Sequence, residues 1–299
     1  MRITKFKGIF VSLVAVLIFP AALPAQQSDQ APVAKPNPHV EAHVGDVTGH
    51  PDAGSDLYYR YCWGCHGARG NGDGENAPYL NPTPRNFVAG IFKCRSTPTG
   101  TLPTDDDLYH SIERGFYTTT MPSWITLTAQ NRADLVAFIK TFSARWATDK
   151  AGEPIQIPPE PKLTVESIKR GKEVFQKMEC WKCHGQEGRG DGPSAATLTD
   201  SFDQPIRPYD FAQGTRFKCG TTNQDLYKIF MTGLDGTPMP SFASVIKPEE
   251  AWDLVHYLRT LQVSHASPEL ALWKTTPEGA AFLAAEKVRN TPTGSGLAP

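Results

Sequence analysis

The sequence predicts an all-α protein built from two tandem copies of one domain. The hexapeptide CWGCHG begins at Cys62, and CWKCHG begins at Cys180. Further blocks, such as DLYHSIERG and DLYKIFMTG, recur around them in the same order. A repeat of this kind indicates that one structural unit has been duplicated. Apolar residues follow helical spacing in both copies, which makes the repeated unit helical.

The helical pattern is clearest in three segments. Residues 167–184 place apolar side chains near helical spacing before and through the second hexapeptide, and residues 129–142 and 248–261 are amphipathic. Pro248 suits the first turn of a helix, where its missing N–H is not needed. The middle of each copy is rich in glycine and is expected to form loops and tight turns.

Composition narrows the class of protein. The chain has 299 residues, of which 39% are hydrophobic and 20% are charged, with a formal net charge of -1. These values are typical of a globular protein of about two domains. Because basic and acidic residues are interspersed, no basic stripe is available for a phosphate backbone, and we expect no nucleic-acid partner.

The N-terminus reads as a targeting segment. Residues 1–25 carry three basic residues, then a short apolar run ended by Pro20, and we predict a secretory signal cleaved after Ala25. The alternative is an uncleaved anchor that keeps the protein at a membrane, although the apolar run is shorter than a span needs. Residues 26–50 are predicted to form a flexible leader. The mature protein is therefore expected to be periplasmic or otherwise exported.

The repeat also sets the predicted domain boundaries. The first copy occupies residues 51–147 and the second residues 164–265. Between them, residues 148–163 are rich in proline and are predicted to form a stiff, extended linker. Residues 266–299 are predicted to be a peripheral tail that can contain one helix.

The repeated hexapeptide contains the attachment signature of c-type haem, C-x-x-C-H. The motif occurs at Cys62, Cys65 and His66, and again at Cys180, Cys183 and His184. In such a motif the two thiols form thioethers with the haem vinyl groups, and the imidazole is the proximal iron ligand. A redox dithiol needs a strand-helix-strand context, and a zinc site needs two more close ligands; the sequence offers neither. We therefore predict two covalently bound haem c groups.

A sixth iron ligand is predicted from a second repeated block. Met121 in TTTMPSW and Met239 in GTPMPSF both lie in a Met-Pro loop between predicted helices. Proline blocks helix continuation and fixes such a loop. A thioether ligand raises the reduction potential relative to two imidazoles. The alternative is that both methionines fill gaps in the core.

These motifs resemble a dihaem cytochrome c made of two class I cytochrome c domains. The resemblance covers about residues 50 to 263 and implies a few helices wrapped round each haem. It also implies that Phe138 and Tyr257 pack near the haems. Arg85 in TPRNF and Arg207 in IRPYDF are candidate partners for the haem propionates, because a guanidinium group matches a carboxylate. The alternative for both arginines is a solvated surface position.

Cys94 and Cys219 stand at equivalent FKC positions and are not required by the family pattern. In an oxidising compartment two spare thiols tend to pair, which would join the two domains by a disulfide. Separately buried thiols are a second interpretation, since free cysteine packs as a small apolar residue. A third is ligation of haem iron by cysteine, which would indicate catalysis.

The predicted function is transfer of single electrons between a redox protein donor and an acceptor, with no small-molecule substrate required. One alternative is a haem enzyme, such as a dihaem peroxidase or a thiosulfate-oxidising cytochrome, which needs an open or displaceable iron position. His110 is the residue that could assist such chemistry, although a solvated helix face is its simpler interpretation. Another alternative is a cytochrome subunit of a membrane-bound oxidoreductase complex.

Overall fold

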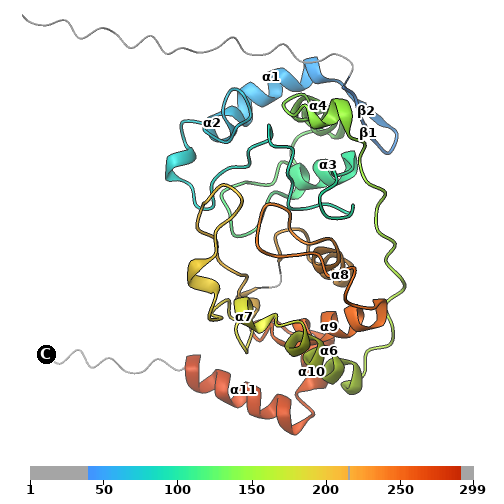
Figure 1. Cartoon of the computed structure of the whole chain (residues 1–299), viewed down its shortest axis with the longest axis vertical. Helices are drawn as coiled ribbons and strands as arrows, with labels where there is room; N and C mark the ends of the chain where they lie inside the picture. The colour runs from blue at the N-terminus through green and yellow to red at the C-terminus, as the bar shows by residue number, and fades with distance from the viewer. Residues whose placement is uncertain (1–39, 215, 291–299) are drawn as a thin grey trace, which may run out of the picture. The chain divides into compact units, whose positions relative to one another are not determined.

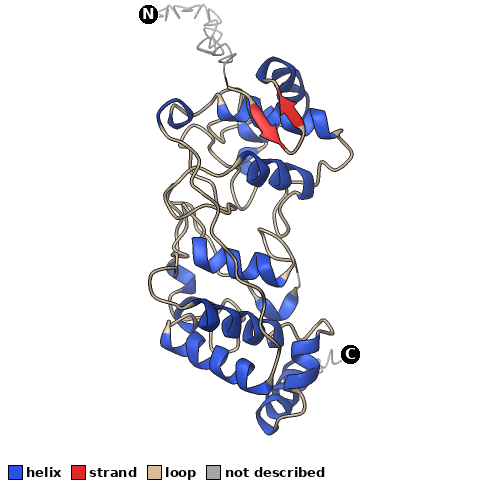
Figure 2. Ribbon diagram, turned by 90° about the vertical axis from the view of Figure 1, so that its right-hand side faces the viewer, coloured by secondary structure: helices blue, strands red, loops and turns tan. Residues whose placement is uncertain are grey.

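The computed structural model describes residues 40–214 and 216–290. Helices dominate the described chain, and a small hairpin supplies its strands (Figure 2). The predicted signal segment, residues 1–25, lies outside the described residues, as do residues 26–39 and 291–299. Among the helices of the described segments, none combines the length and apolar character needed to cross a membrane.

The α-helices α1 to α4 of the first copy recur in the same order as α6 to α9 of the second (Figure 1). The first copy contains α1 (Pro51–Tyr61), α2 (Trp63–His66), η1 (Ala77–Tyr79), α3 (Asp105–Arg114), α4 (Ala129–Lys140) and α5 (Arg145–Thr148). The second copy contains α6 (Val165–Lys177), α7 (Trp181–His184), η2 (Ala195–Thr197), η3 (Phe211–Gln213), α8 (Asn223–Thr232) and α9 (Pro248–Thr260). The predicted helices in residues 129–142, 167–184 and 248–261 are confirmed, and Pro248 is the first residue of α9.

The middle helices α3 and α8 begin at matching caps. The Thr104 hydroxyl accepts a hydrogen bond from the Asp107 backbone N–H, and the Thr222 hydroxyl accepts one from Asp225, both at 3.1 Å. Each aspartate side chain in turn accepts from the backbone N–H of its threonine, which completes a capping box. The same local chemistry therefore starts the same helix in both copies.

In each copy the first long helix crosses the last one at a glycine. A Cβ atom at Gly54 of α1 would lie 2.0 Å from the Asp134 carbonyl oxygen of α4, and one at Gly171 of α6 would lie 1.9 Å from the Asp253 oxygen of α9. Both distances are far inside van der Waals contact, so only glycine permits these crossings. The close crossing holds the start and end of each domain together.

Each copy has its own apolar core. Tyr58 of α1 contacts Phe138 of α4 with ring centroids 5.2 Å apart, and Phe175 of α6 contacts Tyr257 of α9 at 5.5 Å. All four aromatic side chains are buried. Because burial of such side chains is the main stabilising term in folding, the two helix pairs form the framework on which the loops are arranged.

The predicted flexible leader is wrong for its last residues. β1 (Ala42–Val44) and β2 (Val47–Gly49) pair antiparallel, with Gly45 in the turn at φ 53°. Ala42 is fully buried, and the Lys140 ammonium of α4 donates to the Glu41 carbonyl at 2.6 Å. The strands are too short to show a sequence period, and their packing against α4 is what orders them.

The predicted linker and tail also pack more closely than expected. In the linker, Ile155 donates its backbone N–H to the Ser96 carbonyl of the first copy, and Pro158 accepts from the Trp252 indole of the second. The tail forms α10 (Pro268–Trp273) and α11 (Pro277–Asn290), and Trp273 is buried in the second core. Residues 268–273 are therefore part of the second domain's packing, which corrects their prediction as peripheral.

Candidate haem sites

Both C-x-x-C-H motifs fold into a single helical turn. In the first, the backbone N–H of His66 donates to the Cys62 carbonyl at 3.0 Å; in the second, His184 donates to Cys180 at 2.9 Å. Residues three apart on such a turn share one side of it, so the two thiols of each motif face the same way. Gly67, with φ 79°, ends the first turn and redirects the chain.

The two histidines are oriented by backbone carbonyls. His66 Nδ1 lies 3.0 Å from the Arg85 oxygen, and His184 Nδ1 lies 3.2 Å from the Tyr209 oxygen. When Nδ1 donates to a carbonyl, Nε2 is left with its lone pair and is available to a metal. Burial lowers the pKa of both imidazoles, which favours the neutral form that ligation requires. Phe87 stacks on His66, with ring centroids 4.5 Å apart.

The two predicted methionine ligands lie in loops with the same hydrogen bonds. We call residues 115–124 and 233–242 the methionine loops. The Met121 carbonyl accepts from the Phe116 N–H, and the Met239 carbonyl accepts from the Leu234 N–H, both at 3.1 Å. Both methionine N–H groups donate to a threonine hydroxyl two residues earlier, again at 3.1 Å. The loops are therefore one structure used twice.

A large cavity lies at the second motif. It has a volume of about 940 Å³, and Cys180, Cys183, His184 and Met239 all line it. Its apolar walls include the side chains of Phe211, Phe217, Phe230 and Leu258. Cofactor sites typically have this size and an apolar lining with few polar groups. Size, thiols, imidazole and thioether in one cavity fit a covalently attached haem.

The predicted propionate partners have different surroundings. Arg207 is exposed and lines the cavity of the second site. Arg85 is partly buried; its carbonyl holds His66, and its guanidinium lies 5.9 Å from the ring centroid of Phe202, in the second copy. Burial lowers the pKa of Arg85, and the carboxylate of Asp200 opposes that effect. In α9, Leu258 lines the cavity, whereas Tyr257 packs on Phe175 and is not among the lining residues.

Sequence reasoning did not identify the residues that the first copy contributes to the second site. The cavity is also lined by Asn81, Pro82, Lys93, Tyr117 and Thr118. Lys93 is part of the repeated FKC block, as is Lys218, which lines the same cavity. That repeated lysine was a usable signal, because each copy places a basic residue directly before its spare cysteine.

Cys94 and Cys219 form a disulfide between the two copies. Their Cα atoms are 5.2 Å apart and their sulfur atoms 2.02 Å apart. Both distances agree with ordinary disulfide geometry. The first of the three interpretations of these cysteines is thus confirmed, and ligation of iron by either one is excluded because the bonded sulfur atoms are not thiolates.

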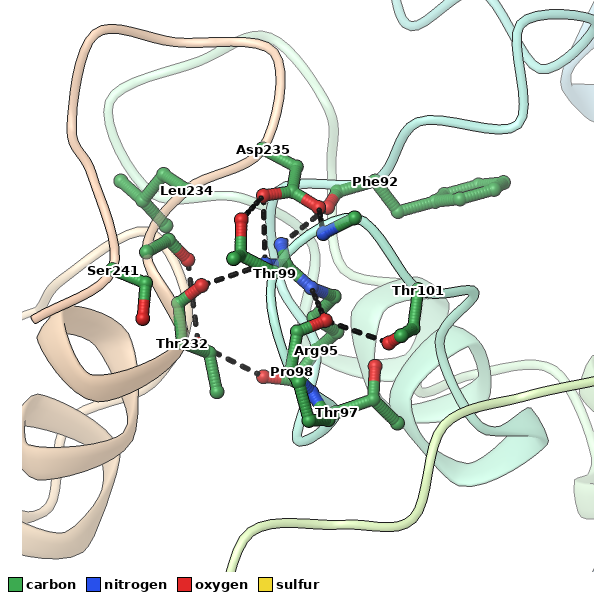
Figure 3. Close-up of polar contacts among 12 residues, drawn as sticks. Phe92, Arg95, Thr97, Pro98, Thr99, Thr101, Thr232, Leu234, Asp235 and Ser241 are labelled. Atoms are coloured by element: carbon green, nitrogen blue, oxygen red, sulfur yellow. Dashed lines mark hydrogen bonds and ion pairs between the residues drawn. The ribbon is translucent and has the colours of Figure 1, made fainter. Parts of the chain in front are cut away.

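Next to the disulfide in sequence, a buried arginine makes further contacts between the two copies (Figure 3). The Arg95 guanidinium is fully buried and donates to Asp235 at 2.7 Å and to the Thr232 carbonyl at 2.6 Å, both in the second copy. Asp235 also accepts from the Thr99 hydroxyl and the Gly100 N–H, each at 2.7 Å. The repeat gives no signal for this cluster, because Asp235 is matched in the first methionine loop by Tyr117.

The fold and site define a protein of two similar helical domains, each with a haem attachment motif. The cytochrome c family profile matches residues 51–143 and again residues 168–262. The chain therefore belongs to the cytochrome c family, and it carries two covalently bound haem c groups. No match to a curated protein was found.

One solved structure is similar to the present chain and matches it over most of both chains. It is a chain of the reducing HAO-like protein complex of Kuenenia stuttgartiensis, with 44% sequence identity and a TM-score of 0.69. The match covers 70% of the present chain and 96% of that chain. That relative is part of a protein complex.

Proposed function

We propose that this chain is an exported dihaem cytochrome c that passes single electrons between redox proteins as a partner of an oxidoreductase complex. Cys62 and Cys65 attach the first haem, and Cys180 and Cys183 attach the second. His66 and Met121 ligate one iron, and His184 and Met239 ligate the other. When bound, each haem supplies reversible one-electron chemistry.

The observation that carries this proposal is that the two methionine loops have the same backbone structure and the same hydrogen bonds. Met239 lines the second cavity, and because both loops use the same hydrogen bonds, we infer that Met121 serves the first iron in the same way. With a histidine and a methionine each holding an iron, the haem would supply one-electron transfer and would offer no free position to a substrate. The candidate acid-base group of the enzymatic alternative, His110, is exposed on α3 and lies 3.0 Å from Glu113.

The proposed partner rests on the similar solved chain. That chain belongs to a reducing HAO-like protein complex, and the match covers 96% of it. The chain can act as a soluble carrier if residues 1–25 are cleaved, or as a tethered subunit if they are retained. The mass of the mature chain distinguishes these two cases.

Two features support export. A disulfide such as Cys94–Cys219 forms and persists in oxidising compartments outside the cytoplasm. The apolar run within residues 1–25 follows the pattern of a secretory signal. We therefore propose a periplasmic or otherwise exported protein.

The haem attachment is tested by mass. The denatured protein is expected to exceed its polypeptide mass by two haems, because thioether bonds survive denaturation. Replacing Cys180 and Cys183 together by alanine should leave one haem, and replacing Cys62 and Cys65 should leave the other. The matched control is the Cys94→Ser, Cys219→Ser variant, which should keep both. An unchanged haem content after either attachment pair is removed would contradict the assignment.

The electron-carrier role is tested with carbon monoxide on the reduced protein. If Met121 and Met239 hold the two irons, the optical spectrum should show no carbon monoxide binding at either haem. Met121→Ala and Met239→Ala should each open one iron, so that each variant binds one carbon monoxide per chain. Binding of one equivalent by the unsubstituted protein would instead favour the haem-enzyme alternative.

A further inference from the structure

Three cationic side chains gather where the two domains meet. Lys93 and Lys218 directly precede the bridged cysteines, so the disulfide holds their backbones close together. The Arg85 guanidinium reaches the second methionine loop, where its Nη1 would lie 3.4 Å from a Cβ atom at Gly236, and its charge lowers the pKa of both lysines. All three side chains are partly buried. The cluster therefore concentrates positive charge beside the disulfide.

This cluster has too few counter-charges. No described carboxylate forms an ion pair with any of the three side chains, and Asp200 is the one acidic residue whose charge acts on Lys93. Burial, followed by repulsion from Arg85 and Lys218, lowers the pKa of Lys93 to about 7. Cations withdrawn from water are normally paired, because the desolvation cost is otherwise uncompensated. Binding of an anion would therefore stabilise this arrangement of cations.

The cavity of the second site offers a place for such an anion. Lys93 and Lys218 both line it, together with Cys180, Cys183 and His184. A haem in this cavity brings two propionate carboxylates with it. Ammonium groups and carboxylates form charge-assisted hydrogen bonds, which are stronger than neutral ones.

We propose that Lys93 and Lys218 bind the propionates of the second haem, so that the first domain supplies part of the second haem's binding site. This inference rests on the proposed function, because it requires a haem in the second cavity. Arg85 does not line the cavity, but its charge acts on both lysines from beside it. In each copy, the FKC block thus supplies a cysteine that joins the domains and a lysine that binds the propionates of the second haem.

As a consequence, Lys93 of the first domain is expected to raise the reduction potential of the second haem. A positive charge near a haem favours the reduced state, which carries one fewer positive charge, and thereby raises the reduction potential. Lys93 exerts this effect only while the two domains are joined. The residue is a positioning and charge-compensating group, not a ligand of the iron.

The test is a spectroelectrochemical titration of Lys93→Gln in the full chain with both haems bound. At a fixed ambient potential, the ratio of reduced to oxidised second haem is expected to fall roughly twofold to tenfold. This is the range for one charge roughly 12 Å from the iron, between the dielectric constant of water and an effective value of about 20. A tenfold change equals about 59 mV for a one-electron couple. The second haem is identified by the potential that Met239→His moves.

Matched variants separate charge from structure. Lys93→Arg keeps the charge and should keep the potential, and Lys218→Gln should lower it as Lys93→Gln does. Lys177→Gln makes the same charge change in the second domain, but Lys177 is exposed and paired with Glu250 at 3.1 Å, so we expect no shift. If Lys93→Gln does not fold, Lys218→Gln carries the test.

An unchanged second potential in Lys93→Gln or Lys218→Gln, with two haems still present by mass, overturns the inference and leaves the proposed function intact. A second potential that moves when inorganic phosphate replaces chloride at constant ionic strength also overturns it, because an exogenous anion then occupies the cluster. Loss of covalent haem from the unsubstituted protein would instead contradict the proposed function.

Discussion

Replacing Cys94 and Cys219 together by serine is expected to lower the free energy of unfolding by about 4 to 5 kcal/mol. The bridge joins cysteines 125 residues apart, and closing so long a loop removes much conformational entropy from the unfolded chain. Both haem spectra should remain, because the bridge lies outside the attachment motifs. Denaturant unfolding, followed by tryptophan fluorescence and by haem absorbance, measures the loss.

Reduction of the unsubstituted protein is the matched control. Dithiothreitol breaks a disulfide but not a thioether, so the reduced protein should unfold at the same denaturant concentration as the double serine variant. Thiol titration of the denatured, unreduced protein should find no free thiol. Two reactive thiols per chain would show that the bridge is not formed, and an altered haem spectrum in the serine variants would reopen a direct role of these cysteines at iron.

Features that depend on local chemistry could be predicted from the sequence. The helices of each copy follow from apolar spacing, and the matching starts of α3 and α8 follow from threonine three residues before aspartate. The attachment motifs and the methionine loops repeat in sequence, and they repeat in structure. Duplication made these predictions possible because each copy supported the interpretation of the other.

Features that depend on how the copies meet could not be predicted in this way. The three interpretations of Cys94 and Cys219 differ by whether their Cα atoms lie within bridging distance, and spacing in sequence does not give that distance. Arg95 and Asp235 lack counterparts of the same type in the other copy, so the repeat does not mark them. The hairpin over residues 42–49 was missed because its order comes from contact with α4.

Replacing Arg95 by methionine is expected to cost about 3 to 5 kcal/mol of unfolding free energy, the range for removing one partner of a buried ion pair. The side chain is fully buried, and its loss leaves the carboxylate of Asp235 without its cation. Asp235 lies in the methionine loop of the second domain, four residues before Met239. On heating, the near-infrared sulfur-to-iron band of the variant should therefore fall to one-haem intensity at a temperature where the unsubstituted protein keeps both.

The second substitution Asp235→Asn distinguishes the ion pair from simple loss of packing. If the uncompensated carboxylate causes the damage, adding Asp235→Asn to Arg95→Met should restore part of the lost stability, because a neutral amide costs less to bury than an unpaired charge. Lys177→Met is the matched control: it breaks an exposed pair, for which about 0.2 to 1 kcal/mol is expected. Equal loss of both sulfur-to-iron bands in Arg95→Met would show that the cluster stabilises the whole chain, whereas selective loss of one band assigns Arg95 of the first domain to holding the ligand loop of the second.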